Sequence, residues 1–156
     1  MNPILIQLNV SDGGMPKLAV QSARVTPQGV EGDQQRNLKY HGGPDRAVCL
    51  FSHELYDFLR DKGIDIPYGS VGENFTTKNL DLNALKIGDR LKVGDCIIEI
   101  TDVRTPCGNL KKFDPDLPEL IVGRSGWVAK VIEEATVRPN DPIQLLPIQP
   151  PTTNLK

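Results

Sequence analysis

The sequence is poor in aromatic residues and in cysteine, and it contains no long apolar stretch. Aromatic residues make up 5% of the 156 residues, so aliphatic side chains must fill the interior. Three cysteines without a C-x-x-C pair argue against a disulfide framework and against a structural zinc site. No segment has the length of a transmembrane helix or the pattern of a secretory signal. These absences predict a cytoplasmic protein that does not bind membranes.

An excess of positive charge is also missing. The formal net charge is -2, whereas a domain that binds nucleic acid is normally basic overall. We therefore expect no nucleic-acid partner, although a local cationic pocket for a small anion is compatible with this balance. Glycine and proline, in contrast, are plentiful, with 14 and 13 residues. They indicate many turns and short elements and thus favour a mostly β fold.

Hydrophobic periodicity predicts the first elements of the chain. Residues 4–10 and 18–25 read as strands, and the apolar run over residues 47–51 reads as a buried strand. Ser52 is placed to cap a helix over residues 52–62, with Phe51 and Tyr56 spaced for a hydrophobic staple and Gly63 after its end. Residues 29–45, which precede the buried strand, and residues 67–78, which follow the helix, are predicted to be loops.

The second half of the chain predicts further strands. Residues 91–100 alternate around Gly94-Asp95 as a hairpin does, and residues 109–113 suggest a helical turn. Residues 127–134 fit either a helix or a strand; we favour a strand followed by a hairpin loop at 138–141. One domain over residues 1–147 and a flexible C-terminal tail over residues 148–156 are expected.

One of the three cysteines has an unusual setting. Cys49 and Cys96 lie within predicted strands, where a thiol is usually a small buried hydrophobic group. Cys107 follows a strand in a turn, with Arg104 before it and two lysines at 111–112 after it. Nearby cations favour the thiolate, which is the form that attacks electrophiles and binds metals. Cys107 could ligate a metal, carry a persulfide, or have no role, and its local sequence leaves these readings open.

A glycine pair suggests an anion-binding loop before the buried strand. Gly42 and Gly43 allow the backbone to approach a ligand closely, and successive N–H groups can surround an anion. Arg46 can hold a phosphate with two hydrogen bonds, and His41 is a possible donor. The alternative is an ordinary turn with Asp45 and Arg46 as a surface ion pair.

Other turns carry polar groups that suit a ligand. Glu73 and Asn74, within the turn at 72–75, can offer matched acceptors and donors to the edge of a heterocycle. The turn at 30–33 is similar, and caps or Asx turns would explain both. The segment from Arg124 to Trp127 fits either a second anion clamp or closure of the core by its tryptophan.

Taken in order, these motifs resemble the MOSC family, named after the C-terminal domain of molybdenum cofactor sulfurase. The resemblance extends over nearly the whole chain to Leu146. A departure is Asn140 before Asp141, where the family commonly has glycine; asparagine tolerates the left-handed conformation, so we expect a similar turn. The matching stretches are VEGD at 30–33, HGGPDRAV at 41–48, VGENFT at 71–76, IGDRLKVG at 87–94, RTPC at 104–107, GRSGWVAKV at 123–131 and Asp141.

The resemblance implies a mostly β, MOSC-type β-barrel with a few short helices, of the small stand-alone bacterial type. It also implies an oxidoreductase that binds the molybdenum cofactor, a molybdopterin-bound molybdenum, and reduces N-hydroxylated compounds such as hydroxylaminopurines with electrons from a partner reductase. Two alternatives stay open: a carrier of sulfur or cofactor, and a non-catalytic anion-binding barrel. Cys107 is implied as catalytic residue and metal ligand, with the cofactor held by His41, Gly42, Gly43, Arg46, Glu73, Asn74, Arg104, Thr105 and Arg124.

Overall fold

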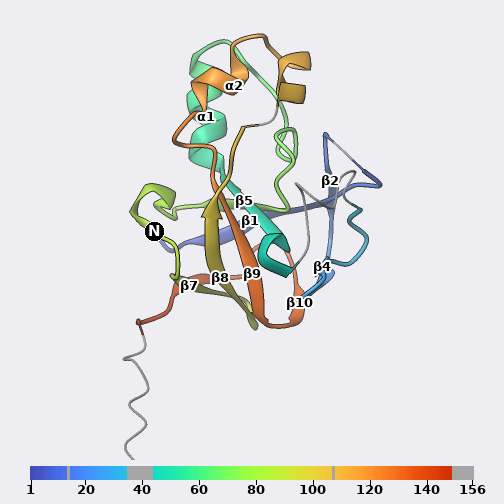
Figure 1. Ribbon diagram of the computed structural model, residues 1–156, viewed down its shortest axis with the longest axis vertical. Coiled ribbons are helices and arrows are strands. Elements are labelled where there is room, and N and C mark those ends of the chain that lie inside the picture. The colour runs from blue at the N-terminus through green and yellow to red at the C-terminus, as the bar shows by residue number, and fades with distance from the viewer. Residues whose placement is uncertain (14, 35–43, 107, 149–156) are drawn as a thin grey trace, which may run out of the picture.

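The structure is a computed structural model that describes residues 1–13, 15–34, 44–106 and 108–148 (Figure 1). Within these ranges it is mostly β with a few short helices, as predicted. The helices are α1 (His53–Asp61) and α2 (Leu117–Leu120), with the 3-10 turns η1 (Pro44–Arg46), η2 (Leu82–Ala84) and η3 (Gly108–Lys112). The strands are β1 (Ile4–Val10), β2 (Leu18–Val20), β3 (Ala23–Thr26), β4 (Gly29–Val30), β5 (Val48–Ser52), β6 (Phe75–Lys78), β7 (Arg90–Val93), β8 (Cys96–Val103), β9 (Trp127–Glu133), β10 (Ala135–Val137) and β11 (Ile143–Leu145).

The described strands form two sheets. The larger has the order β11-β7-β8-β9-β5-β6-β1-β2, and the smaller has the order β10-β3-β4. A closed barrel, which the resemblance implied, is not found among the described strands. The start of β1 meets the approach of β11 in an isolated bridge between Ile4 and Pro142, with backbone hydrogen bonds beside it but no continuous ladder between the two strands. Pro142 is part of this bridge and Pro3 directly precedes it, and a proline has no N–H with which to extend a ladder.

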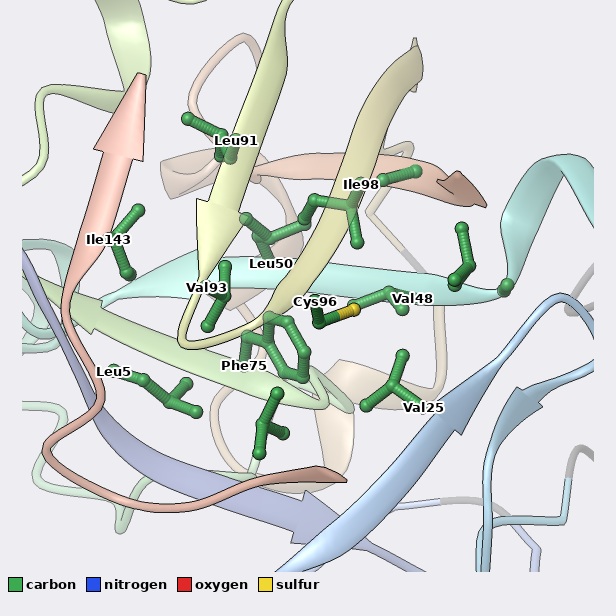
Figure 2. Close-up of a cluster of buried hydrophobic side chains, with 14 of the residues drawn as sticks. Leu5, Val25, Val48, Leu50, Phe75, Leu91, Val93, Cys96, Ile98 and Ile143 are labelled. Carbon is green, nitrogen blue, oxygen red and sulfur yellow. The ribbon is translucent and has the colours of Figure 1, made fainter. Parts of the chain in front are cut away.

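The main core lies against the larger sheet and is almost wholly aliphatic (Figure 2). Leu50, Leu91 and Ile98 have no exposed surface, and Phe75 contributes a large aromatic ring to the same cluster. Burial of each such side chain stabilises the fold by about 1.5–3 kcal/mol. This core fixes the central strands β5, β6, β8 and β9, whose ends carry the residues considered below.

The predicted helix is present as α1, and its start has the expected caps. The Ser52 side chain accepts a hydrogen bond from the backbone N–H of Leu55 at 3.1 Å, and the rings of Phe51 and Tyr56 meet edge to face at 5.1 Å. Gly63 follows the helix with a φ of +84°. A second apolar cluster packs α1 against α2, which lies beside it at one end of the molecule (Figure 1).

Several predicted elements were wrong in extent or pairing. Residues 18–25 form two strands in different sheets, and residues 75–78, predicted as loop, are β6. The hairpin expected around residues 138–141 does not form, because β10 pairs with β3 and β11 pairs with β7. An alternating pattern reveals that a segment is a strand but not which strand lies beside it.

The structure confirms four further predictions, which concern a hairpin, a strand, a helical turn and the backbone conformation of Asn140. The hairpin β7–β8, the strand β9 and the turn η3 are all present, and Asn140 has the left-handed φ of +76°. Within the described residues, no helix is long and apolar enough to cross a membrane. The tail expected to be flexible lies outside the described residues from position 149 onward.

Candidate functional site

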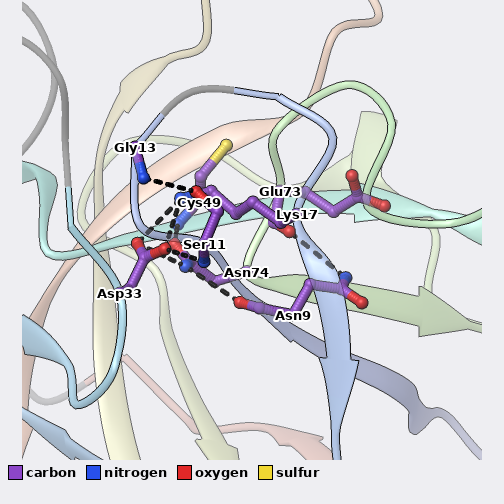
Figure 3. A network of polar contacts seen from close by, with 8 residues as sticks. All are labelled: Asn9, Ser11, Gly13, Lys17, Asp33, Cys49, Glu73 and Asn74. Carbon is purple, nitrogen blue, oxygen red and sulfur yellow. Dashed lines mark hydrogen bonds and ion pairs between the residues drawn. The ribbon is translucent and has the colours of Figure 1, made fainter.

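The parallel pairing of β5 with β6 places Cys49 beside Asn74 (Figure 3). The backbone N–H of Asn74 donates to the Cys49 carbonyl at 2.9 Å, and the N–H of Cys49 donates to Asn74 Oδ1 at 3.0 Å. Asn74 Nδ2 also donates to the Asn9 carbonyl at 3.3 Å and to Asp33 Oδ2 at 3.0 Å. Asn74 is fully buried. Its side-chain amide, which the sequence predicted to contact the cofactor, is instead hydrogen-bonded to Cys49, Asn9 and Asp33 of the protein itself.

A buried ion pair joins two loops at the same place. Lys17 Nζ lies 2.6 Å from Asp33 Oδ1, and the two side chains are 9% and 3% exposed. Asp33 Oδ1 also accepts the backbone N–H of Ser11 at 2.9 Å. The aspartate of the VEGD turn therefore holds Ser11, which follows β1, and Lys17, which precedes β2, in addition to the Asn74 amide.

Glu73 is directed into the protein and has no exposed surface. Its Oε1 accepts the hydroxyl of Tyr56 at 2.8 Å. Its Oε2 accepts the N–H of Gly69 at 3.1 Å and the hydroxyl of Thr76 at 2.8 Å. Burial raises the pKa of the Glu73 carboxyl above its ordinary value, although these hydrogen bonds act in the opposite direction. Burial, and then the neighbouring Glu73 charge, likewise raise the pKa of Tyr56.

Arg104 follows β8 and turns its side chain toward this polar region. Its backbone N–H donates to the Gly126 carbonyl at 3.0 Å, and the Ser125 hydroxyl donates to its carbonyl. Arg104 Nη1 is buried and has no hydrogen-bond partner among the residues that the structure describes. A Cβ atom at Gly72 would lie 3.2 Å from Arg104 Nη2 and 3.1 Å from Met15 Sδ. Glycine at position 72 therefore leaves room for the guanidinium group.

The two other cysteines remain thiols in this environment. Burial raises the pKa of the Cys49 thiol, and the positive charge of Arg104 opposes this rise without cancelling it. Burial raises the pKa of Cys96 to about 12. Cys96 is the buried hydrophobic group that the sequence predicts, whereas Cys49 is only half-buried and borders the polar region.

Arg46 and Arg124, the predicted phosphate clamps, contact different elements. Arg46 Nη2 lies 3.3 Å from Asp102 Oδ2 on β8, in an exposed ion pair that differs from the Asp45 pairing considered above. The Arg124 guanidinium lies over the ring of Phe58 on α1, at 4.7 Å from its centroid. No described contact links the two arginines to each other.

Trp127 closes the core, one of the two readings that its sequence allowed. Its indole nitrogen donates to the Leu82 carbonyl at 2.8 Å, and its side chain packs on the main apolar cluster. Thr105 is exposed beside Arg104. His41, Gly42, Gly43 and Cys107 lie outside the described residues, so their predicted roles stay predictions.

The structure thus brings together three of the predicted site residues, Glu73, Asn74 and Arg104. It adds Lys17 and Met15, which sequence reasoning missed because nothing in the short segment before β2 distinguishes them from ordinary loop residues. The described residues contain no group of three or more His, Cys, Asp or Glu side chains placed to hold a metal. A polar region beside Cys49, to which Arg104 and Lys17 contribute positive charge, is what the arrangement offers chemically.

The comparisons with known proteins agree with the family suggested by the motifs. The MOSC domain family matches residues 37–144, and the chain belongs to this family. The uncharacterized protein YflK of Bacillus subtilis is 31% identical over 144 residues, covering 88% of this chain and 64% of YflK. Protein YiiM of Escherichia coli is 33% identical over 131 residues, covering 78% of this chain and 58% of YiiM.

A third relative and a solved structure extend the comparison. A protein of Gibberella moniliformis named "Reductase" is 33% identical over 127 residues, covering 76% of this chain and 22% of that protein. The crystal structure of YiiM from Escherichia coli has the same fold, with a TM-score of 0.75 and 24% identity over 96% of this chain and 71% of YiiM. In the sequence comparisons, the chain spans 64% of YflK and 58% of YiiM, which is less than two thirds of each relative.

Proposed function

We propose that this chain binds the molybdenum cofactor and reduces N-hydroxylated compounds, such as hydroxylaminopurines, with electrons from a partner reductase. MOSC family membership supports a molybdenum-related function, and the relative named "Reductase" is compatible with redox chemistry. The proposal includes a cytoplasmic location and a single MOSC domain over residues 1–147.

The observation that carries the proposal is the guanidinium group of Arg104. Buried polar atoms in proteins normally have hydrogen-bond partners, and Arg104 Nη1 has none within the described part of the chain. A guanidinium fork matches the oxygens of a phosphate, so this polar region suits an anionic cofactor. Gly72 fits the same reading, because any larger residue there would crowd the guanidinium group.

The remaining residues of the proposed site have supporting roles. Cys107, three residues after Arg104, would ligate molybdenum. Thr105, which directly follows Arg104, would contact the cofactor. Backbone groups of the loop at 41–43, with Arg46 and Arg124, would bind anionic groups at the periphery. When bound, the cofactor would supply the redox chemistry, while the protein supplies placement and electrostatics.

Metal analysis tests the proposal directly. We would produce wild type, Cys107→Ser and Arg104→Gln in cells with an intact cofactor pathway and measure molybdenum per chain. We expect bound molybdenum in the wild type and at least a roughly tenfold loss in each variant, because each removes a ligand or an anion contact. Wild-type protein without molybdenum would contradict the proposal, and full molybdenum in Cys107→Ser would contradict direct ligation.

A second measurement separates an enzyme from a carrier. Cofactor-loaded wild type would be given a hydroxylaminopurine and a supplied electron donor, and the reduced purine would be quantified. We expect reduction by the wild type and none by Cys107→Ser. Bound molybdenum without any reduction would instead favour the carrier of sulfur or cofactor.

A further inference from the structure

Gly69 connects the buried carboxylate of Glu73 to two segments near Arg104. Its N–H donates to Glu73 Oε2 at 3.1 Å. Its carbonyl accepts two backbone N–H groups, that of Lys17 at 2.9 Å and that of Gly72 at 3.0 Å. A Cβ atom at position 69 would lie 2.2 Å from the Lys17 carbonyl, so the two backbones are in close contact. The position of Gly69 therefore sets the positions of both segments.

Both segments lie close to the position where the backbone of Gly72 approaches the guanidinium group. Gly72 belongs to one, and Met15, two residues before Lys17, belongs to the other. A Cβ atom built on Gly72 would lie 3.0–3.1 Å from the Met15 side chain and 3.2 Å from Arg104 Nη2. The Lys112 ammonium also donates to the Met15 carbonyl and so gives this segment a further contact.

We propose that Glu73 is a positioning residue for Arg104: through Gly69, its carboxylate holds the backbone of Gly72 beside the guanidinium group and the segment of Met15 and Lys17 beside Gly72. This inference rests on the proposed function, because it assigns the contact with the anionic cofactor to Arg104. It also implies that Glu73 does not contact the cofactor itself. Direct contact between Glu73 and a pterin is the alternative. It requires an exposed carboxylate, whereas Glu73 has no exposed surface and both of its oxygens are hydrogen-bonded within the protein.

The chemistry of Glu73→Gln makes it a sharp probe. The amide keeps the size of the side chain, but only one of its two polar atoms can accept a hydrogen bond. It therefore cannot accept from both Tyr56 and Gly69, as the carboxylate does. Asp89→Asn is the matched control, since Asp89 is a nearly buried acid that accepts the N–H of Lys86 in a different part of the fold.

Two readouts test the inference in full-length protein. Inorganic phosphate serves as the anion probe, with its dissociation constant measured by calorimetry. The guanidinium N–H resonance of Arg104 is observed by ¹⁵N NMR and assigned through Arg104→Lys. We expect Glu73→Gln to weaken phosphate binding about tenfold, which corresponds to the loss of one well-placed hydrogen bond. It should also shift the Arg104 resonance, whereas Asp89→Asn should alter neither readout.

The outcomes separate this inference from the proposed function. A folded Glu73→Gln protein with wild-type phosphate affinity and an unmoved Arg104 resonance would overturn the positioning role. If Glu73→Gln does not fold, Thr76→Val replaces it, because this variant removes one donor from the same Oε2 atom. The same two readouts then decide, with an expected weakening of about threefold. If phosphate binds equally to wild type and Arg104→Lys, the anion site fails, while the Arg104 resonance still tests positioning.

Discussion

The apolar core and the polar region beside β5 and β6 are stabilised in different ways. The core in Figure 2 is built from aliphatic side chains that interact through shape and area. The polar region in Figure 3 is built from buried groups that each need a particular partner, such as Lys17 with Asp33. Cores tolerate volume-conserving changes, whereas a buried charge without its partner is costly. The comparison indicates that the polar region is the more specific part of the fold, and four predictions test it.

The largest effect is expected from breaking the buried ion pair. Lys17→Met leaves the Asp33 carboxylate buried without its cation, so the free energy of unfolding should fall by about 3–5 kcal/mol. Urea unfolding measures the change. The control is Arg24→Met, which breaks an exposed ion pair with Glu134 and should cost less than about 1 kcal/mol. Equal losses of stability in the two variants would mean that burial of the Lys17–Asp33 pair does not make it more important than an exposed pair.

A cavity in the apolar core should cost somewhat less. Leu91→Ala truncates a side chain with no exposed surface and should lower the free energy of unfolding by about 3 kcal/mol. Ile98→Val, which removes a single methylene from the same cluster, should cost only about 1 kcal/mol. Both are measured by urea unfolding. A loss for Ile98→Val as large as that for Lys17→Met would mean that the core is the less tolerant region.

The buried carboxyl of Glu73 predicts a pH dependence. Because burial raises its pKa, the folded protein holds this proton more tightly than the unfolded chain does. The resulting stabilisation is complete below the ordinary glutamate pKa of about 4.3 and is lost as pH rises through the folded value. Wild type should therefore lose stability relative to Glu73→Gln as pH rises from that point. Urea unfolding of both proteins across this range gives the difference, and a difference that is constant with pH would contradict the raised pKa.

The smallest effect is expected at the cap of α1. Ser52→Ala removes the acceptor for the Leu55 N–H and should lower the free energy of unfolding by about 1 kcal/mol. Thermal unfolding and urea unfolding both report this loss. Ser52→Thr, which keeps the hydroxyl acceptor, should retain most of the stability. Should alanine and threonine behave alike at position 52, the cap would have no measurable role.

Local elements were predictable where all the residues that determine an element lie within one short stretch of sequence. The α1 helix is an example, since its cap, its staple and its terminating glycine all lie within thirteen residues. The β7–β8 hairpin is another, because its turn and both strands are contiguous. The break between β2 and β3 was missed because β2 pairs with the nearby β1, whereas β3 pairs with β10, which is distant in the chain and belongs to the other sheet. Pairing of distant strands depends on the whole sheet rather than on the pattern of one segment.

The candidate site was predictable only in part for the same reason. The motifs indicated Glu73, Asn74 and Arg104, but they gave no indication that the first two are directed into the protein. They also gave no reason to consider Lys17 or Met15, whose importance comes from contacts with residues 33 and 72. A polar side chain in a turn looks the same in sequence whether it contacts a ligand or another loop.

The sequence by itself determined the family, the mostly β character and the helix after β5, because composition, turn residues and ordered motifs act locally or are read in chain order. Tertiary structure alone decided which polar groups are buried together around Cys49 and which guanidinium nitrogen lacks a partner among the described residues. The physical reason is that burial and hydrogen bonding depend on neighbours in space. Here those neighbours come from segments as far apart as β1, β6 and the turn after β8.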